Sequence, residues 1–175
     1  MKAFRLIPIL FLVVFTSCKD DVPTEEVALD PVVSTFYFIR HAEKDRSDPE
    51  NPDPELNQDG LGRAMRWEKV LTNIPINAIY STNYERTNMT AAPLAVNKDI
   101  VVREYDPSTV DVEAFKANHE GENVLVVGHS NTTPDFVNKM IGEEKYQQMD
   151  DYDNGSLFIV RIIDGAVTDI HLNMD

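Results

Sequence analysis

The chain has 175 residues, of which 16 are basic and 30 acidic, and its formal net charge is −14. This length suits one domain with a hydrophobic core of its own. The strong negative charge repels polyanions, so we expect no nucleic-acid partner.

Residues 1–17 have the pattern of a secretory signal peptide. Lys2 and Arg5 precede an apolar run from Leu6 to Phe15, and small or hydroxylated residues follow it. The run is shorter than the roughly 20 apolar residues that span a membrane as a helix. We expect residues 1–17 to be removed, which leaves 14 basic and 30 acidic residues and a net charge of −16.

Cys18 is the only cysteine of the chain, which rules out an intramolecular disulfide. Residues 14–18 (Val-Phe-Thr-Ser-Cys) resemble a bacterial lipobox, in which the cysteine is lipidated and becomes the mature N-terminus. Residues 19–21 resemble a signal for export to the outer leaflet, although a solvated linker explains them equally well. We therefore expect a secreted lipoprotein anchored through Cys18 at the outer membrane or cell surface, with the periplasmic face as an alternative.

The folded domain is expected to span residues 32–175. The segment before it, residues 18–31, is acidic, contains proline and lacks periodicity, which is typical of a flexible tether. Apart from Ser34, residues 32–39 are β-branched or aromatic, and this nearly continuous apolar run predicts a strand buried on both faces. A polar loop with three prolines follows from Glu43 to Glu55.

The rest of the domain alternates between helix and strand patterns. We expect helices over 58–71 with Asn57 as the N-cap, over 84–96 with Pro93 accommodated inside, over 110–118 and from Thr132, and strands over 76–81, 100–102, 123–129, 156–163 and 167–172. Asp164-Gly165 is typical of a hairpin turn. This alternation predicts an α/β fold, a three-layer α/β/α sandwich around a mainly parallel central sheet, in which ligands bind beyond the carboxyl ends of the strands.

Three segments at predicted strand ends carry residue types that suit phosphoryl transfer. They are Arg40-His41-Ala42-Glu43-Lys44, Ser-Thr-Asn-Tyr-Glu-Arg-Thr over 81–87, and Val-Gly-His-Ser-Asn over 127–131. Transfer to an enzyme side chain needs a nucleophile, cations for the equatorial oxygens and a proton donor for the leaving oxygen. A neutral imidazole can attack phosphorus, and guanidinium groups present fixed pairs of donors to phosphate oxygens.

These segments resemble the histidine phosphatase superfamily, which includes cofactor-dependent phosphoglycerate mutases and short phosphohistidine phosphatases. The resemblance begins with Arg-His-Ala-Glu-Lys after a strand and extends from Phe36 to Pro134, through residues 53–57, Gly60, Arg63, Ala64 and the two later segments. It implies a phosphoglycerate mutase-like fold. It also implies that His41 is phosphorylated and that Arg40, Arg86 and His129 hold the phosphoryl oxygens.

The remaining site residues are less firmly indicated. Asn131 begins the helix after His129, where its side chain and the free backbone amides are candidates to bind the same anion. Many relatives take their proton donor from an acid after the second arginine, which makes Glu104 the first candidate and Asp106 the alternative. His129 is expected to act as a protonated donor whose pKa the phosphate raises, whereas the arginines lower the pKa of His41.

We interpret the chain as a monomeric, metal-independent phosphatase without a cofactor, which hydrolyses a phosphomonoester or a related small phosphorylated substrate through a phosphohistidine on His41. A phosphomutase is one alternative. The others are a metal-dependent hydrolase that uses His41, Glu43 and His129, and a surface lipoprotein that binds a phosphate ligand with little turnover. Some short phosphohistidine phosphatases have an arginine where Pro54 or Glu55 stands here, which weakens the assignment of a protein phosphohistidine as the substrate.

Three further residues receive structural predictions. Trp67 is expected in the core, because a single aromatic residue on an amphipathic helix usually packs there. His119 and His171 have no companions that suggest chemistry, so we expect both to be exposed to solvent without a role.

Overall fold

The computed structural model describes residues 30–174, so Cys18 and the segment that resembles a lipobox lie outside the described residues. The elements in chain order are β1 (Val33–Arg40), α1 (Gln58–Leu71), β2 (Ala78–Ser81), α2 (Glu85–Lys98), β3 (Arg103–Glu104), α3 (Val112–Asn118), β4 (Asn123–Gly128), α4 (Thr132–Ile141), β5 (Ser156–Ile163) and β6 (Ala166–Asn173). None of the helices in the described part is both long and apolar enough to cross a membrane.

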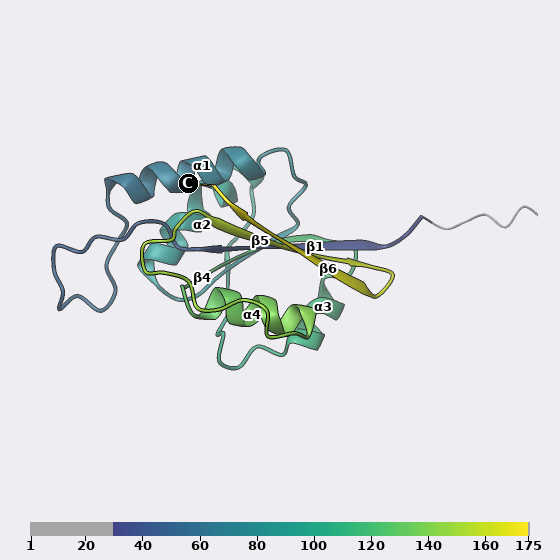
Figure 1. Cartoon of the computed structure of the whole chain (residues 1–175). Helices are drawn as coiled ribbons and strands as arrows, with labels where there is room; N and C mark the ends of the chain where they lie inside the picture. Colours follow the sequence, from purple (N-terminus) through teal and green to yellow (C-terminus); the bar gives the residue numbers. More distant parts are fainter. Residues whose placement is uncertain (1–29, 175) are drawn as a thin grey trace, which may run out of the picture. The chain divides into compact units, whose positions relative to one another are not determined.

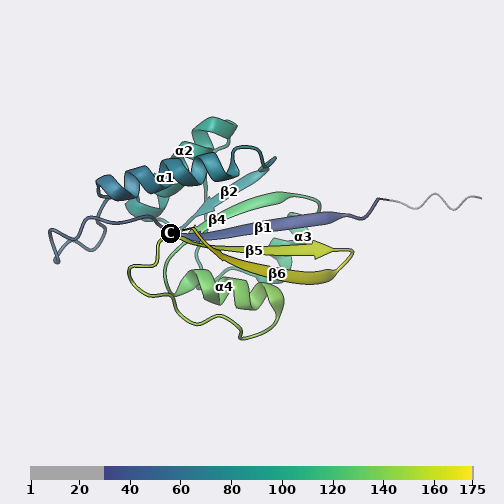
Figure 2. The same ribbon diagram turned by 45° about the horizontal axis from the view of Figure 1, so that its top comes forward.

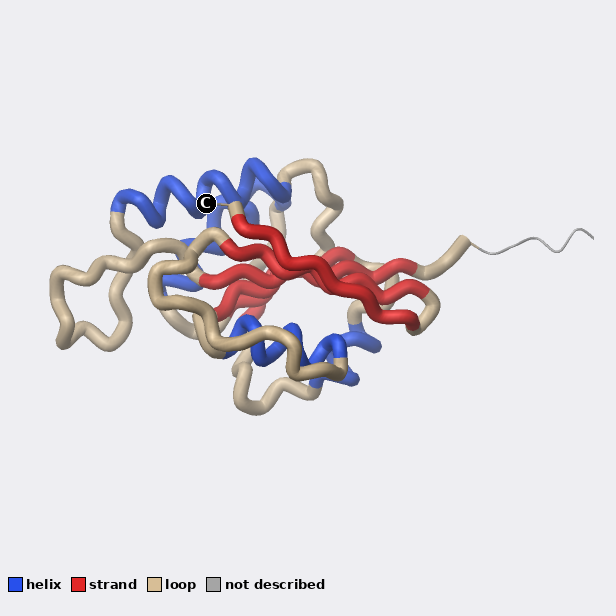
Figure 3. Tube along the Cα trace, in the orientation of Figure 1, coloured by secondary structure: helices blue, strands red, loops and turns tan. Residues whose placement is uncertain are grey.

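The strands form one six-stranded sheet in the order β3-β2-β4-β1-β5-β6. The first four of these strands are parallel, whereas β5 runs antiparallel to β1 and β6 runs antiparallel to β5. Helices α1 and α2 cover one face of the sheet and α3 and α4 cover the other (Figures 1 and 3). The predicted α/β sandwich around a mainly parallel sheet is confirmed.

Strand β1 is buried on both faces, as its sequence predicts. Phe36 and Phe38 pack in the cluster beneath α3 and α4, while Tyr37 and Ile39 pack in the cluster beneath α1 and α2, which also contains Trp67. Alternate side chains of a strand point to opposite faces, so a nearly continuous apolar run is needed where both faces are covered. Figure 2 shows β1 between β4 and β5 in the middle of the sheet.

The start of α1 lies against the segment that follows β1. The Asn57 side chain accepts a hydrogen bond from the backbone N–H of Gly60 at 2.9 Å and so caps the helix, as expected. The backbone N–H of Asn57 donates to the carbonyl of Glu43 at 2.9 Å, and Lys44 forms an isolated bridge with Leu56. These contacts close the polar loop at its base.

The third strand differs from the prediction. It comprises Arg103–Glu104 and not residues 100–102, because helix α2 continues to Lys98 with Pro93 inside it. Asp99 then adopts the left-handed conformation (φ 54°), and the backbone N–H of Ile100 donates to the carbonyl of Ala95 at 3.0 Å. Ile100, the first residue of the predicted strand, therefore belongs to the helix ending, and pairing with β2 begins only at Arg103.

The expectation that His119 is exposed was wrong. Its side chain is buried, with Nδ1 at 2.6 Å from Glu122 Oε2 and Nε2 at 3.0 Å from the Tyr80 hydroxyl. Tyr80 comes from β2, so the sequence next to His119 does not reveal this partner. His171 is exposed, as expected, and its ring stacks on Phe158.

Candidate active site

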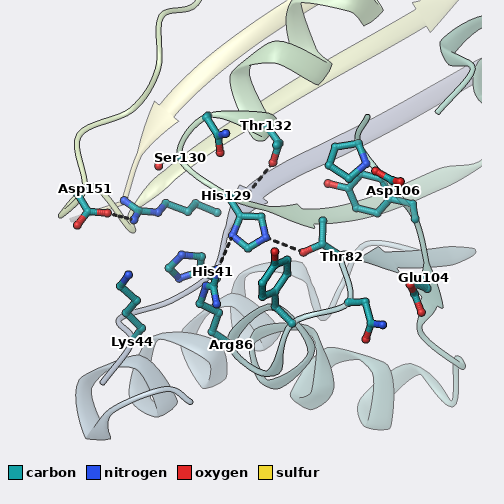
Figure 4. A pocket seen from close by; sticks show the side chains of 16 residues that line it. His41, Lys44, Thr82, Arg86, Glu104, Asp106, His129, Ser130, Thr132 and Asp151 are labelled. Atoms are coloured by element: carbon teal, nitrogen blue, oxygen red, sulfur yellow. Dashed lines mark hydrogen bonds and ion pairs between the residues drawn. The ribbon is translucent and has the colours of Figure 1, made fainter. Parts of the chain in front are cut away.

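A pocket of about 600 Å³ lies beyond the carboxyl ends of the parallel strands. It is lined by Arg40, His41, Lys44, Thr82, Asn83, Tyr84, Arg86, Glu104, Tyr105, Asp106, Pro107, His129, Ser130, Asn131, Thr132 and Asp151 (Figure 4). The seven candidate catalytic and phosphate-binding residues named from the sequence are all among them. The parallel strands place the chain positions that follow β1, β2 and β4 at this one edge of the sheet.

His41 directly follows β1, and its backbone is held on two sides. Its N–H donates to the carbonyl of Gly128 at 2.9 Å, and its carbonyl accepts from Asn154 Nδ2 at 2.8 Å. The ring nitrogen Nδ1 lies 2.7 Å from the carbonyl oxygen of Ala42. Because a carbonyl only accepts, we assign the ring hydrogen to Nδ1, which leaves a lone pair on Nε2.

The environment of His41 favours its neutral form. Burial lowers the pKa of His41 to about 3, and the neighbouring Arg40, His129 and Arg86 act in the same direction against the hydrogen bond to Ala42. The predicted influence of the arginines is therefore present, although burial is the larger cause. A neutral ring with a free Nε2 is the form that can act as a nucleophile.

His129 ends a directional chain of hydrogen bonds. Thr87 Oγ1 donates to the carbonyl of Thr82 at 2.8 Å, and Thr82 Oγ1 donates to Thr87 Oγ1 at 3.1 Å. Thr82 Oγ1 therefore accepts from His129 Nε2 at 2.9 Å, while His129 Nδ1 lies 3.4 Å from Arg86 Nη2, which can only donate. This network assigns a neutral His129 with its hydrogen on Nε2.

The pKa of His129 is also lowered, to about 4, by burial and by Arg86, Arg40 and Lys44. We had expected the pKa values of the two histidines to diverge, with that of His129 raised by phosphate. The protein groups alone lower both, so any rise at His129 has to come from a bound anion. The two imidazole rings are close neighbours, with centroids 5.4 Å apart.

Arg86 is positioned by the polar loop. Its Nη1 lies 3.1 Å from Asp53 Oδ1, and its guanidinium covers the ring of Tyr84 at 4.3 Å from the centroid. The Asp53 carboxylate also accepts from the backbone N–H of Glu85 at 3.1 and 3.2 Å. Asp53 thus caps α2 from outside the helix, since Tyr84 at the N-cap supplies no side-chain bond.

Arg40 is held by the segment between α4 and β5. Its guanidinium Nη1 donates to the carbonyls of Asp150 at 2.7 Å and Asp153 at 3.2 Å, and Nη2 donates to Asp151 Oδ1 at 2.7 Å. Asp151 was not predicted from the sequence. The available signal was the run of acidic residues before β5, because a buried guanidinium requires several acceptors.

Lys44 adds a third cation to Arg40 and Arg86 around His41. Burial lowers its pKa, and Asp151 opposes that effect. Lys44 belongs to the first motif, but the sequence alone predicted no role for it. The same is true of two residues of the second motif, Thr82, which bonds His129, and Tyr84, which lies under Arg86.

The proton-donor candidates lie apart from His41. Figure 4 shows Glu104 and Asp106 on the opposite side of His129 from His41. Asp106 Oδ1 accepts from the Ser108 hydroxyl at 2.6 Å and from its backbone N–H at 2.8 Å, and these bonds lower the Asp106 pKa. Glu104 is exposed at the end of β3 and lacks this constraint. Glu104 is therefore the less constrained of the two carboxylates.

The residues of the metal-dependent alternative do not converge. Glu43 forms an ion pair with Arg63, at 2.7 Å from Nη2, and does not line the pocket. Within residues 30–174 no three His, Cys, Asp or Glu side chains are grouped to hold a metal ion. Asn131 does line the pocket as the N-cap of α4, and its side chain makes no capping hydrogen bond.

Comparisons with known proteins place these features in context. Residues 36–107 match the family model of the histidine phosphatase superfamily (branch 1), a range that includes Arg40, His41 and Arg86. Among curated protein sequences there is no significant match. The family model thus matches the part of the chain that carries the first two motifs, as the resemblance predicted.

Several solved structures share the fold. The protein histidine phosphatase SixA complexed with tungstate has 14% identity, covers 79% of this chain and 96% of its own, and gives a TM-score of 0.64. The α-ribazole phosphatase from Shigella flexneri has 15% identity, the same two coverages and a TM-score of 0.61. YhfR from Bacillus stearothermophilus has 17% identity, coverages of 77% and 94%, and a TM-score of 0.60.

Proposed function

We propose that this chain, which has the sequence pattern and the fold of the histidine phosphatase superfamily, hydrolyses a phosphomonoester or a related small phosphorylated compound. The observation that carries the proposal is the state of His41. Its Nδ1 is bonded to a backbone carbonyl and its pKa is low, so Nε2 carries a lone pair among three cations. The names of the fold neighbours, which include phosphatases of α-ribazole phosphate and of protein histidine, support the same class of reaction.

In the first step, His41 Nε2 attacks the phosphorus atom and the bond to the leaving oxygen breaks. The leaving oxygen takes a proton from an acid, for which Glu104 is our first choice, or from water. The hydrogen remains on Nδ1 and stays hydrogen-bonded to the Ala42 carbonyl. This bond keeps the orientation of the ring and stabilises the positive charge that the ring acquires. The product of this step is a phosphohistidine and a free alcohol.

In the second step, water attacks the phosphorus atom and the N–P bond breaks. The electron pair returns to His41 Nε2, the proton that the water loses restores the acid used in the first step or stays on the phosphate, and inorganic phosphate leaves. Arg40, Arg86 and Lys44 stabilise the charge on the equatorial oxygens in both transition states. Arg40 and Arg86 are suited to this task because each is held by acceptors on one side, which fixes the donors that remain.

We also propose that the domain works outside the cytoplasm as a monomer tethered by a lipid on Cys18. The pattern of residues 1–17, the lipobox-like segment and the absence of any other cysteine support this proposal. Labelling with radioactive palmitate tests it, because a Cys18→Ser variant should lose the label and the membrane association. Gel filtration of the Cys18→Ser variant in buffer without detergent would give the oligomeric state.

The decisive experiment compares the wild type with His41→Asn in the full-length protein. The variant should lose turnover of p-nitrophenyl phosphate by on the order of 1,000-fold or more, since no other group can form the intermediate. His171→Asn is the matched control, because His171 is exposed and outside the pocket, and it should retain activity. Turnover that persists in His41→Asn, or that requires a divalent metal, would refute the proposal.

A further inference from the structure

Arg40 has donors left over after the protein has bound it. A guanidinium group carries five N–H donors in one plane. The loop between α4 and β5 takes both hydrogens of Nη1 and one of Nη2. Nε has no hydrogen-bond partner among the described residues, and one hydrogen of Nη2 also remains. Arg40 lines the pocket, so these two donors, which we call the free edge of Arg40, are the ones that a phosphoryl group can use.

Asp151 places a negative charge next to that edge. Its Oδ1 is 2.7 Å from Arg40 Nη2 and its Oδ2 is 2.7 Å from Arg46 Nη1, while its backbone carbonyl accepts from Arg46 Nη2 at 2.8 Å. The Arg46 guanidinium in turn lies over the ring of Tyr152, 4.7 Å from its centroid. Asp151 lines the same pocket as Arg40, and a dashed line in Figure 4 marks its bond to that guanidinium.

We infer that Asp151 sets the affinity of the pocket for phosphate, and that it does so by repulsion. A phosphoryl dianion on the free edge of Arg40 would share Nη2 with the Asp151 carboxylate. The two anions therefore repel each other across one guanidinium group, which weakens binding of inorganic phosphate and promotes its release. This inference rests on the proposed function for its role in turnover, but the repulsion itself requires only that the pocket binds phosphate.

The position of Arg40 does not depend on the charge of Asp151. Two backbone carbonyls hold Nη1, and the Arg40 side chain is only 2% exposed. Asparagine at position 151 would still offer an oxygen to Nη2. The charge can therefore be removed while the geometry is kept.

The test is titration of the full-length protein with inorganic phosphate at low ionic strength, by calorimetry. Asp151 is half exposed, so we expect Asp151→Asn to bind phosphate roughly three- to tenfold more tightly than the wild type, and the difference to shrink in high salt. The matched control is Glu120→Gln, which also removes one acidic charge. Glu120 is exposed and does not line the pocket, so phosphate affinity should stay the same.

Two results would overturn the inference. Equal affinity of Asp151→Asn and the wild type would mean that the carboxylate does not act on the anion. Weaker binding by Asp151→Asn would mean that its charge supports Arg40 and does not compete with phosphate. The titration does not require turnover, so it is independent of the activity assay. If Asp151→Asn bound phosphate more tightly and the wild type had no phosphatase activity, the proposed function would be refuted and this inference would remain valid.

Discussion

A single methyl group at position 60 should separate the start of α1 from the segment that carries His41. A Cβ atom on Gly60 would lie 2.1 Å from the carbonyl oxygen of Glu43 and 3.0 Å from its backbone nitrogen and carbonyl carbon. These are backbone atoms, so rotation of a side chain cannot relieve the overlap. Gly60→Ala requires a backbone shift of about 1 Å to restore normal contact distances.

The cost follows from what that shift breaks. Overpacking of a tightly packed site costs about 1–3 kcal/mol, and loss of the hydrogen bond between the Asn57 N–H and the Glu43 carbonyl adds about 1 kcal/mol. Alanine returns roughly 0.5–1 kcal/mol of helix propensity. We expect Gly60→Ala to lower the free energy of unfolding by about 1–3.5 kcal/mol, which corresponds to a fall in Tm of roughly 2–14 °C.

Gly62→Ala is the matched control, two residues further along the same helix. A Cβ atom there would meet only the end of the Arg66 side chain, at 3.6 Å, which is an ordinary contact. We expect this variant to be as stable as the wild type or about 0.5–1 kcal/mol more stable. Urea unfolding followed by circular dichroism measures both. If Gly60→Ala were as stable as Gly62→Ala, the close approach of α1 to Glu43 would be refuted.

Three further predictions concern the pocket. Folding lowers the pKa of His41 from 6.5 to about 3, so the unfolded chain binds more protons and the free energy of unfolding falls as the pH drops below about 6.5. Between pH 7 and pH 5 the wild type should lose roughly 2 kcal/mol of stability through His41, and urea unfolding of His41→Asn should lack this part of the loss. The same pH dependence in both proteins would contradict this prediction. Thr82→Val removes the acceptor for His129 Nε2 and should lower kcat/KM by about tenfold or more, whereas Thr82→Ser should restore it if the hydroxyl is what matters. The buried hydroxyl of Tyr105 has no partner among the described residues, so Tyr105→Phe should unfold at the same urea concentration or higher, and a clear loss of stability would reveal a bond that this structure lacks.

Much of the fold was predictable because its signals are local. The buried run of β1, the cap at Asn57 and the Asp164-Gly165 turn each depend on neighbouring residues, and each appears where expected. The displacement of β3 has a different origin. It depends on how far α2 continues past Pro93, which packing decides and not the local pattern.

The site was predictable to the extent that parallel strands bring their carboxyl ends together. Arg40, Arg86 and His129 meet for that reason, although they are distant in sequence. Asp151 could not be placed in this way, because it lies in the segment between α4 and β5 and does not follow a parallel strand. The buried position of His119, at the end of α3, was missed because its partner Tyr80 lies in β2, far from it in the sequence.

Strand β5 runs antiparallel to β1, so the segment before β5 lies beside the pocket and can be varied separately from the sheet. The chain enters β5 at the same edge where β1 delivers His41, so the residues before β5 must pass the pocket. Asn138 fixes the segment at Lys145 and Tyr146, and Met149 N–H is bonded to the Ser130 carbonyl. Asp153 anchors the segment at its other end, because its carboxylate accepts from the Ser156 backbone N–H and hydroxyl. A library of sequences at Asp151 and Tyr152, between these two anchored points, could therefore retune substrate selectivity while the backbone carbonyls of Asp150 and Asp153 still hold Arg40.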